Sequence, residues 1–495
     1  STDLTFTEDR TGRFAAYGWH TVTVEDGNDL AAIEGAIAAA RAETERPSFL
    51  SIRTHIGYGS PHKQDTFEAH GAPLGEEEVL RTKEALGWPP EPAFHRPEAA
   101  LRQFRRAVEA GRDAEARWQA EFAAWEGAFP DLAVEFEMSL RGNLPSRWDA
   151  DIPVFPADAK GPATRAASGK IIAAIGSRLP ALIGGSADLN PSTLSTLPGE
   201  GDFGPAGFPP RDPQGTVGGG WSYAGRNLHF GVREHGMGAI LNGLAAHGGT
   251  LPYGATFLIF SDYMRPPIRL AAMAGLHVIY LFTHDSIGLG EDGPTHQPVE
   301  QLAGLRAIPG LIVIRPCDAN ETAAAWRVAV ETRDRPVALV LSRQSVPTLD
   351  RSWFTAADGL RHGAYILADA PGGEPSVILL ASGSEVGLAV AAREELLDEN
   401  IGVRIVSMPS WELFDAQPAA YRDTVLPPAV SARLAIEAGS PQGWHRYARD
   451  VLGVTRFGAS APGATILREY GFTAEAVCAR VRALLGAGRK EPVDA

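Results

Sequence analysis

Residues 277–298 read His277-Val-Ile-Tyr-Leu-Phe-Thr283-His284-Asp285-Ser-Ile-Gly-Leu-Gly-Glu291-Asp292-Gly-Pro-Thr-His296-Gln297-Pro298, an apolar run that leads into a loop rich in histidine and carboxylate. Parallel strands covered on both faces are apolar throughout, so the run predicts a buried strand. In α/β proteins, the loops beyond the carboxyl ends of such strands carry the functional side chains. The stretch therefore predicts a parallel sheet with a functional site in this loop.

Other short apolar runs alternate with alanine-rich stretches along the chain, which is typical of α/β proteins. We expect the α/β class, with successive three-layer α/β/α domains and mainly parallel sheets. The predicted strands are Thr21–Glu25, Phe49–Arg53, Ala181–Ile183, Val278–Phe282, Leu311–Ile314, Val337–Leu341, Ser376–Leu380, Val403–Val406 and Arg433–Glu437. The predicted helices are Ile33–Ala42, Met237–Ala246, Asn320–Thr332 and Glu385–Asp398.

The length of 495 residues is too great for one hydrophobic core, so several domains are expected. Residues 1–74 and 151–350 have the alternating α/β pattern, and residues 351–495 form a third such region. Residues 75–150 are charged and helical in composition, which predicts a helical connector. The proline- and glycine-rich segment 197–220 predicts a long surface loop.

The composition excludes several function classes. A net charge of −15 argues against a nucleic-acid partner, because such proteins carry a basic face. The most apolar stretch, 270–282, is interrupted by His277 and is shorter than the ~20 residues that cross a bilayer, so no membrane span is expected. Two cysteines favour a reducing compartment, and the cytoplasm is the predicted location.

Three polar residues follow predicted strands of the middle region: Asp188, His284 and Arg343. If those strands are neighbours, the three side chains converge on one edge of the sheet. Each residue alone also has a structural interpretation, since an aspartate caps helices and an arginine pairs with helix carboxyl ends. Convergence favours a site.

Glu234 lies in the glycine-flanked segment 231–238, at the start of a predicted helix. A glutamate in a first helical turn interacts with the helix dipole and needs no further function. Phe257, Phe260 and Tyr263 have the spacing of one helix face, and aromatic residues so spaced are more often core than cofactor contacts.

Taken together, these motifs resemble the transketolase family over nearly the whole chain, from Ser1 to about residue 485. The long loop string is far more specific than any single glycine motif. The matching segments are Ile56–Pro61, His70–Gly75, Gly184–Asp188, Gly231–His235, Thr256–Phe260, Thr283–Gln297 and Leu341–Gln344.

The resemblance implies transfer of a two-carbon ketol unit from a ketose phosphate, such as xylulose 5-phosphate, to an aldose phosphate, such as ribose 5-phosphate. Thiamine diphosphate would supply the carbon chemistry. The implied domains are a remnant of the diphosphate-binding domain at 1–74, the connector at 75–150, a pyrimidine-binding domain at 151–350 and the transketolase C-terminal domain at 351–495.

The resemblance also implies roles for individual residues. Catalytic roles fall to Glu234, which would face the cofactor's ring nitrogen, and to His296 and His70, near the reacting carbons. The implied cofactor-binding residues are Phe260, Glu234, His70, Phe257, Tyr263, Ile56 and Asp188. The implied substrate-binding residues are Arg165, Ser192, His284 and Arg343 at the phosphate, and Asp292, His296 and His70 at the sugar.

The chain departs from the family pattern in one respect. No Gly-Asp-Gly turn, which binds Mg²⁺ and the diphosphate in the family, occurs in the sequence. We therefore expect no metal ligand in this chain, and expect the Mg²⁺ ligands in a segment of ~150–200 residues ahead of Ser1, judged from ordinary domain sizes. The implied partners are sugar phosphates and either a second copy of the chain, in a homodimer, or a complementary N-terminal chain.

Three functional interpretations follow. The chain is part of an active transketolase, or it is an inert fragment with a structural or regulatory role. As a third alternative it is a relative with different chemistry, such as a 1-deoxyxylulose-5-phosphate synthase or the beta subunit of a 2-oxoacid dehydrogenase. The grouping of His284, Asp292 and His296 disfavours the third, because these residues would serve sugar hydroxyls that pyruvate-type donors lack.

Overall fold

The computed structural model describes residues 2–206 and 215–487. Its contacts fall into two units, Ser1–Ala124 and Trp125–Ala495. The first unit contains a parallel pair of strands, β1 (His20–Val24) and β2 (Ser48–Ile52). The helices of this unit are α1 (Arg10–Ala16), α2 (Leu30–Ala42), α3 (Glu68–Gly71), α4 (Glu76–Ala85) and most of α5 (Glu98–Ala128).

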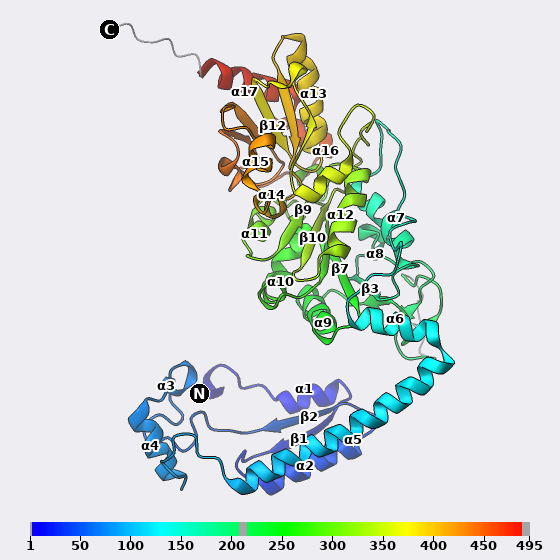
Figure 1. Cartoon of the computed structure of the whole chain (residues 1–495). Coiled ribbons are helices and arrows are strands. Elements are labelled where there is room, and N and C mark those ends of the chain that lie inside the picture. Colours follow the sequence, from blue (N-terminus) through cyan, green and yellow to red (C-terminus); the bar gives the residue numbers. More distant parts are fainter. Residues whose placement is uncertain (1, 207–214, 488–495) are drawn as a thin grey trace. The chain divides into compact units, whose positions relative to one another are not determined.

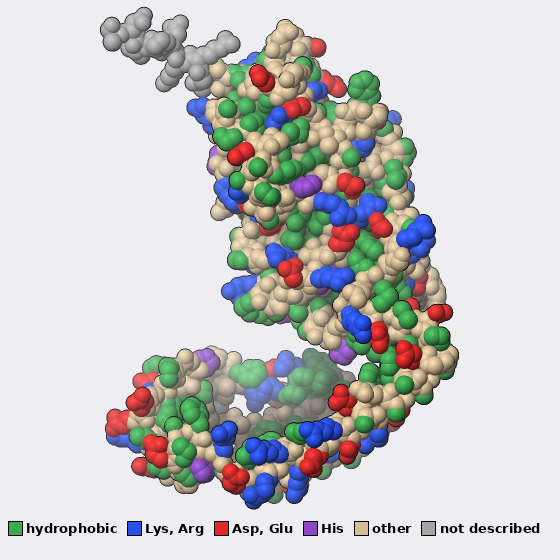
Figure 2. Space-filling model, viewed as in Figure 1, with side chains coloured by type: hydrophobic (Ala, Val, Ile, Leu, Met, Phe, Trp, Pro, Cys, Tyr) green, Lys and Arg blue, Asp and Glu red, His purple; other side chains and the backbone are tan. Residues whose placement is uncertain are grey.

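The helices α4, α5 and α6 (Pro130–Leu140) lie in the stretch predicted as a helical connector. α5 has no buried residue, and Figure 2 shows acidic and basic side chains side by side along it. Charges of both signs at helical spacing stabilise an exposed helix through pairs three and four residues apart. This explains why the charged sequence forms a helix without a core of its own.

The second unit contains an eight-stranded sheet in which every neighbouring pair is parallel. The strand order is β5-β4-β6-β3-β7-β8-β10-β9. The strands are β3 (Leu182–Ser186), β4 (Asp202–Phe203), β5 (Trp221–Ser222), β6 (Asn227–His229), β7 (Leu251–Phe257), β8 (Ile279–Thr283), β9 (Ile312–Ile314) and β10 (Val337–Leu341).

Helices cover both faces of this sheet (Figure 1). Successive residues of a strand point to opposite faces, so Leu281 packs in one core and Phe282 in the other. The first core includes Trp326, whose indole nitrogen donates to the hydroxyl of Ser168 at 2.8 Å. α7 (Thr164–Gly176) and α12 (Ala319–Glu331) contribute to the first core, and α9 (Glu234–His247), α10 (Ser261–Ala274) and α11 (Gln301–Arg306) contribute to the second.

A five-stranded sheet forms the C-terminal part of the second unit, in the order β11-β13-β12-β14-β15. Only β11 runs antiparallel to its neighbour among the described strands of this sheet. The strands are β11 (Tyr365–Ala368), β12 (Val377–Ala381), β13 (Val403–Ser407), β14 (Arg433–Ile436) and β15 (Asp450–Leu452). The helices are α13 (Glu385–Asp398), α14 (Trp411–Asp415), α15 (Ala419–Val425), α16 (Gly463–Glu469) and α17 (Ala474–Ala487).

The predicted α/β class with mainly parallel sheets is confirmed. The segment 197–220, predicted as a surface loop, contains the short strand β4, while its residues 207–214 lie outside the described part of the chain. Among the described residues, every helix is too short or too polar to span a bilayer.

Candidate functional site

Seven residues line one cavity of about 500 Å³ in the second unit. Six of them are the residues of this unit predicted to bind substrate, and the seventh is a predicted cofactor contact. The structure thus brings together side chains that are far apart in the sequence, such as Arg165 and Arg343. The residues before them, Thr164 and Ser342, are hydrogen-bonded to each other across 178 positions. The lining residues are Arg165, Ser192, Phe257, His284, Asp292, His296 and Arg343.

Adjacent strands position the cavity wall. β7 pairs with β8, and β8 pairs with β10, all in parallel. Phe257 is the last residue of β7, His284 follows β8, and Arg343 follows β10 after one serine. The prediction that residues beyond strand ends meet at one edge of the sheet is therefore confirmed for His284 and Arg343.

Two guanidinium groups face the cavity without a carboxylate partner among the described residues. Nη1 of Arg165 donates to the carbonyl of Ser192, in the short helix α8 (Asn190–Thr193). Burial lowers the pKa of Arg165, and the charge of Arg343 lowers it further. Since the two cations repel each other, an anion bound between them would remove that repulsion. The pair is suited to a phosphate, which accepts paired hydrogen bonds from guanidinium groups.

His284 has a left-handed backbone, with φ of 62°, and is only 3% exposed. Burial lowers its pKa from 6.5 to about 3, with further lowering by Arg165, Arg343 and His296. Its Nδ1 lies 2.8 Å from the hydroxyl of Thr283. The imidazole is therefore neutral near pH 7, and meets a ligand as a hydrogen-bonding group and not as a cation.

An aromatic row lies beside the cavity, and its origin differs from the prediction. Phe257, Phe260 and Tyr263 were expected on one helix face, but Phe257 ends strand β7 and Phe260 ends the 3₁₀ helix Leu258–Phe260. Only Tyr263 lies in α10. The rings are nevertheless consecutive, with centroids 5.8 Å apart for Phe257 and Phe260 and 6.0 Å apart for Phe260 and Tyr263.

Glu234 is the first residue of α9 and is 7% exposed. Its carboxylate accepts one long hydrogen bond, 3.4 Å from the hydroxyl of Thr256, the residue before Phe257. The hydroxyl of Ser261, next to Phe260, is buried without a partner among the described residues. A buried carboxylate needs donors, so this arrangement fits a flat ring that carries N–H groups, such as the aminopyrimidine of thiamine diphosphate.

Asp292 and His296 lie on the loop Thr283–Gln297, called the site loop below. Asp292 is exposed, and its side chain has no hydrogen bond or ion pair among the described residues. The ring of His296 lies 5.6 Å from that of Phe260, and its Nδ1 lies 2.9 Å from the hydroxyl of the neighbouring Thr295. Both side chains are therefore available to a ligand in the cavity.

Three predicted site residues are placed elsewhere. Asp188 is exposed after β3, with φ of 64°, and does not line the cavity. His70 and Ile56 belong to the first unit, where both are exposed, with His70 in α3. Their predicted roles stay predictions.

Comparison with known proteins identifies the family. Residues 1–145 match the family described as "Transketolase, thiamine diphosphate binding domain", residues 160–348 match "Transketolase, pyrimidine binding domain", and residues 363–473 match "Transketolase-like TK C-terminal domain". The chain is 52% identical over 488 residues to the transketolase of Geobacillus stearothermophilus, covering 98% of the chain and 71% of that protein. The chain belongs to the transketolase family.

Solved transketolase structures have the same fold. The transketolase from Leishmania mexicana matches with a TM-score of 0.89 and 40% identity, over 100% of the chain and 70% of that structure. A Pichia stipitis transketolase in complex with sedoheptulose 7-phosphate matches with a TM-score of 0.91 and 38% identity, over 99% of the chain and 70% of that structure.

The comparisons decide between the three interpretations. High-coverage relatives named transketolase confirm a transketolase-type transferase and do not favour an inert fragment or a relative with other chemistry. The described residues hold no group of three or more His, Cys, Asp or Glu that fits a metal ion, so no step is assigned to Mg²⁺. The expectation that its ligands precede Ser1 gains no support from the match at residues 1–145.

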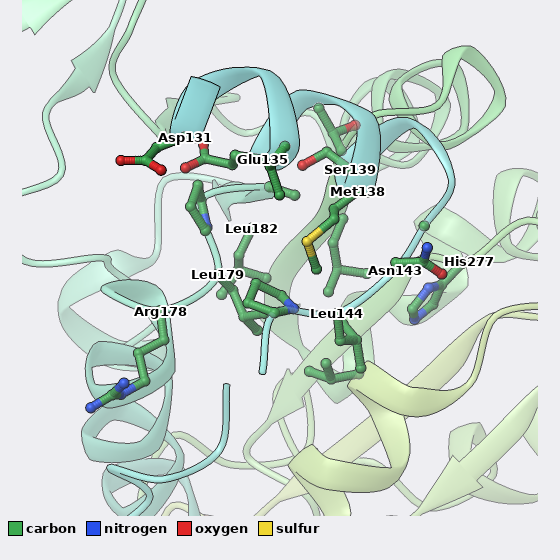
Figure 3. Close-up of a pocket in the computed structure, with 18 residues that line it drawn as sticks. Asp131, Glu135, Met138, Ser139, Asn143, Leu144, Arg178, Leu179, Leu182 and His277 are labelled. Carbon is green, nitrogen blue, oxygen red and sulfur yellow. The ribbon is translucent and has the colours of Figure 1, made fainter. Parts of the chain in front are cut away.

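A second cavity, of about 290 Å³, lies beneath α6 and is largely apolar (Figure 3). Its walls include Leu182 and Leu251, which begin β3 and β7, so it is at the amino edge of the sheet. Figure 3 shows Asp131 and Glu135 above Leu179 and Leu182. None of the predicted site residues lines it.

The sequence did not predict the two residues that hold the site loop through buried hydrogen bonds, Arg315 and Gln297. Arg315 follows β9, is fully buried, and donates through Nε to Asp285 of the site loop at 2.9 Å. Gln297, at the other end of that loop, is 1% exposed and donates to two main-chain carbonyls. For Arg315 the available signal was a charged residue directly after an apolar run, and for Gln297 its place in the loop motif. Neither signal reveals a partner far away in sequence.

Proposed function

We propose that this chain binds sugar phosphates in the cavity at the carboxyl edge of the middle sheet and, with thiamine diphosphate, transfers a two-carbon ketol unit from a ketose phosphate to an aldose phosphate. The observation that carries the proposal is the pair Arg165 and Arg343. These two cations lie in one cavity with His296 and Asp292, and neither forms an ion pair with a carboxylate in the part of the chain that the structure describes. In a protein of net charge −15, such a pair is a local anion site.

The phosphate end of the substrate would lie between Arg165 and Arg343, each of which donates N–H groups to its oxygens. Neutral His284 would add one further N–H and no charge, consistent with its depressed pKa. These contacts fix the substrate along the cavity and favour phosphorylated sugars over free ones.

The sugar end would be read by Asp292 and His296. A carboxylate accepts a hydrogen bond from a hydroxyl, so Asp292 suits a residue that distinguishes hydroxyl configuration. His296 has an imidazole that can accept and return a proton at a substrate hydroxyl, and its ring is next to the aromatic row. His70, in the first unit, stays a predicted catalytic residue.

The cofactor supplies the carbanion chemistry that breaks and forms the carbon–carbon bond. Phe257, Phe260 and Tyr263 would hold its pyrimidine by stacking, and Glu234 would hold a proton on the ring nitrogen that faces it. Burial of Glu234 beside Thr256 keeps competing water away from that proton. Asp188 would contact the cofactor at its edge, and Ile56, in the first unit, stays a predicted cofactor contact.

The proposal includes the assembly and the setting. We infer a homodimer, because large apolar side chains are exposed on α9 and α10. Mg²⁺ would accompany the diphosphate. Both cysteines are free and buried, in agreement with the reducing cytoplasm.

The test is a ketol-transfer assay from xylulose 5-phosphate to ribose 5-phosphate with Mg²⁺ and thiamine diphosphate. Because the chain covers 71% of its Geobacillus relative, the assay is run with and without any second polypeptide that co-purifies. Turnover supports the proposal. Absence of both turnover and sugar-phosphate binding in every preparation that is shown to be folded would refute it.

The role of Glu234 is tested by Glu234→Gln. The variant keeps the shape but loses the charge that holds the ring proton, so turnover should fall by at least about 100-fold. Thermal unfolding should stay close to that of the unmodified chain. The control is Glu374→Gln, at an exposed position outside the site. Turnover retained in Glu234→Gln would contradict the assigned role.

A further inference from the structure

Polar contacts link both ends of the site loop to the C-terminal domain, residues 363–473, through Arg315 at its start and directly at its end. At its start, Asp285 is 3% exposed and accepts from Nε of Arg315 at 2.9 Å. The Nη2 atom of Arg315 lies 2.8 Å from the same carboxylate oxygen. Arg315 also donates through Nη1 to the carbonyl of Ser382 at 3.0 Å and to the carboxylate of Glu385.

These contacts join two sheets through one side chain. Ser382 directly follows β12 and Glu385 begins α13, both in the C-terminal domain, whereas Arg315 follows β9 of the middle sheet. Glu385 also accepts from the main-chain N–H of Ala438, 2.9 Å away, after β14. A fully buried guanidinium with three hydrogen-bonded neighbours has a fixed geometry, so the position of Asp285 depends on the C-terminal domain.

The other end of the site loop is held by Gln297. Its Nε2 donates to the carbonyl of Gly290, across the loop, at 2.8 Å, and to the carbonyl of Ala459, in the C-terminal domain, at 2.9 Å. The hydroxyl of Ser460 donates to the carbonyl of Glu291 at 2.5 Å. Gly458 packs so closely on this amide that any side chain there would overlap it.

The residues that would read the sugar have no comparable support of their own. The side chain of Asp292 has no hydrogen bond among the described residues, and His296 has one, to the adjacent Thr295. Their positions therefore follow the main chain of the site loop. Gln297 fixes that main chain at Gly290, two residues before Asp292, and directly after His296.

We propose that Gln297 and Arg315 are positioning residues through which the C-terminal domain holds Asp292 and His296 in the geometry that binds the sugar. The inference rests on the proposed substrate site but concerns residues that touch no substrate. Arg165 and Arg343 lie outside the site loop, and His284 lies at its start, 13 positions before Gln297, so binding of a bare phosphate should depend little on the Gln297 amide. Loss of the Gln297 amide should weaken recognition of the sugar and leave recognition of the phosphate.

The first measurement is hydrogen–deuterium exchange of peptides from the site loop in the full chain. Gln297→Leu removes both donated hydrogen bonds and keeps the side-chain size, and exchange over 286–297 should rise. Arg315→Lys is the second variant, because it keeps a charge in the buried group but loses the forked contact. The matched control is Gln417→Leu, which removes a similar bond, to the carbonyl of Leu413 at 2.9 Å, elsewhere in the C-terminal domain.

The second measurement is calorimetric binding of ribose 5-phosphate and of inorganic phosphate. In Gln297→Leu, affinity for the sugar phosphate should fall by roughly ten- to 100-fold, as expected when the hydrogen bonds of Asp292 and His296 to the sugar are weakened. Affinity for inorganic phosphate should stay within about twofold. Unchanged exchange and unchanged sugar affinity, in a variant that melts like the Gln417→Leu control, would overturn the inference. Failure of the unmodified chain to bind either compound would instead count against the proposed substrate site.

Discussion

At the scale of single residues, the site depends on side chains whose electrostatic partners are incomplete. Arg165 and Arg343 face the cavity with no carboxylate partner among the described residues, and His284 is held neutral beside them. Unpaired cations in a partly buried cavity are destabilising for the free protein and favourable for an anionic ligand. If phosphate binds there, as proposed, relief of this repulsion would contribute to its binding free energy.

Arg343→Ala tests this view directly. The variant loses a charge-assisted contact of about 1.5–3 kcal/mol, so KM for phosphorylated donors should rise by roughly ten- to 150-fold. Steady-state kinetics with xylulose 5-phosphate and with a non-phosphorylated ketose make the comparison. The free sugar should show little change in KM. An unchanged KM for the phosphorylated donor would leave Arg343 with a structural role.

His284 gives the site a pH dependence that can be predicted in sign. Because the folded state depresses its pKa to about 3 from 6.5, the unfolded chain binds a proton first as pH falls below 6.5. Stability is therefore fully present above pH 6.5 and decreases toward pH 3. Between pH 7 and pH 5 the loss due to this histidine should be roughly 1–2 kcal/mol.

Denaturant titration of the unmodified chain and of His284→Asn at pH 7 and pH 5 measures this loss of unfolding free energy. Asparagine tolerates the left-handed backbone at position 284, so the variant should fold. Its midpoint should fall less between pH 7 and pH 5 than that of the unmodified chain. An exposed histidine, His445, supplies the control substitution. Equal losses in all three proteins would contradict the assignment.

At the scale of elements, close packing of strands fixes the middle sheet. β3 contains Gly184 and Gly185, and it pairs with β6 on one side and β7 on the other. Any side chain at Gly185 would overlap the carbonyl oxygen of Leu228 in β6. The glycine is required here by close approach of the backbones.

Gly185→Ala should therefore lower the free energy of unfolding by about 1–3 kcal/mol, the usual cost of overpacking. The matched control is Gly243→Ala in α9, where an added methyl group meets no atom within 4 Å. That substitution should be neutral or stabilise by about 0.5–1 kcal/mol. Thermal unfolding followed by circular dichroism compares the two. Similar melting temperatures for both variants would show that β3 and β6 can move apart without loss of stability.

The elements also show what could be predicted from sequence. β8 and β10 were predictable because they are buried on both faces and apolar throughout. β7 was not, because Pro252 and Gly254 within it are unfavourable in a central strand. The sequence motifs identified His284 and Arg343. The contacts that hold the site loop could not be found in this way, because Arg315 bonds Asp285 across 30 positions and Gln297 bonds Ala459 across 162. Local pattern does not reveal such contacts.

At the scale of the molecule, the proposed homodimer would cover α9 and α10. They pack against each other and carry Glu234 and Tyr263, and large apolar side chains are exposed on both. Exposed side chains of this size are common at interfaces between subunits. Examples on these helices are Ile240, Leu270 and Met273.

The proposed homodimer predicts that the pair Ile240→Glu and Leu270→Glu shifts the chain toward monomer, because two carboxylates would be buried at the contact. Sedimentation velocity of the unmodified chain and of the variant measures the change. Trp353→Glu, at a position 86% exposed and away from both helices, is the control. A monomeric unmodified chain, or a dimer unaffected by the paired substitution, would contradict this interface.

The strand order of the middle sheet has a consequence for synthesis. β10 lies between β8 and β9, although it is made after both. Ile312–Ile314 therefore has no strand to pair with until Val337–Leu341 has been synthesised. Over the same interval, the edge of β8 that pairs with β10 has no hydrogen-bonded neighbour. At ~5–20 residues per second, that interval lasts on the order of seconds on the ribosome. The site loop follows β8 directly, so it would acquire its final conformation only after the nascent chain has passed Leu341.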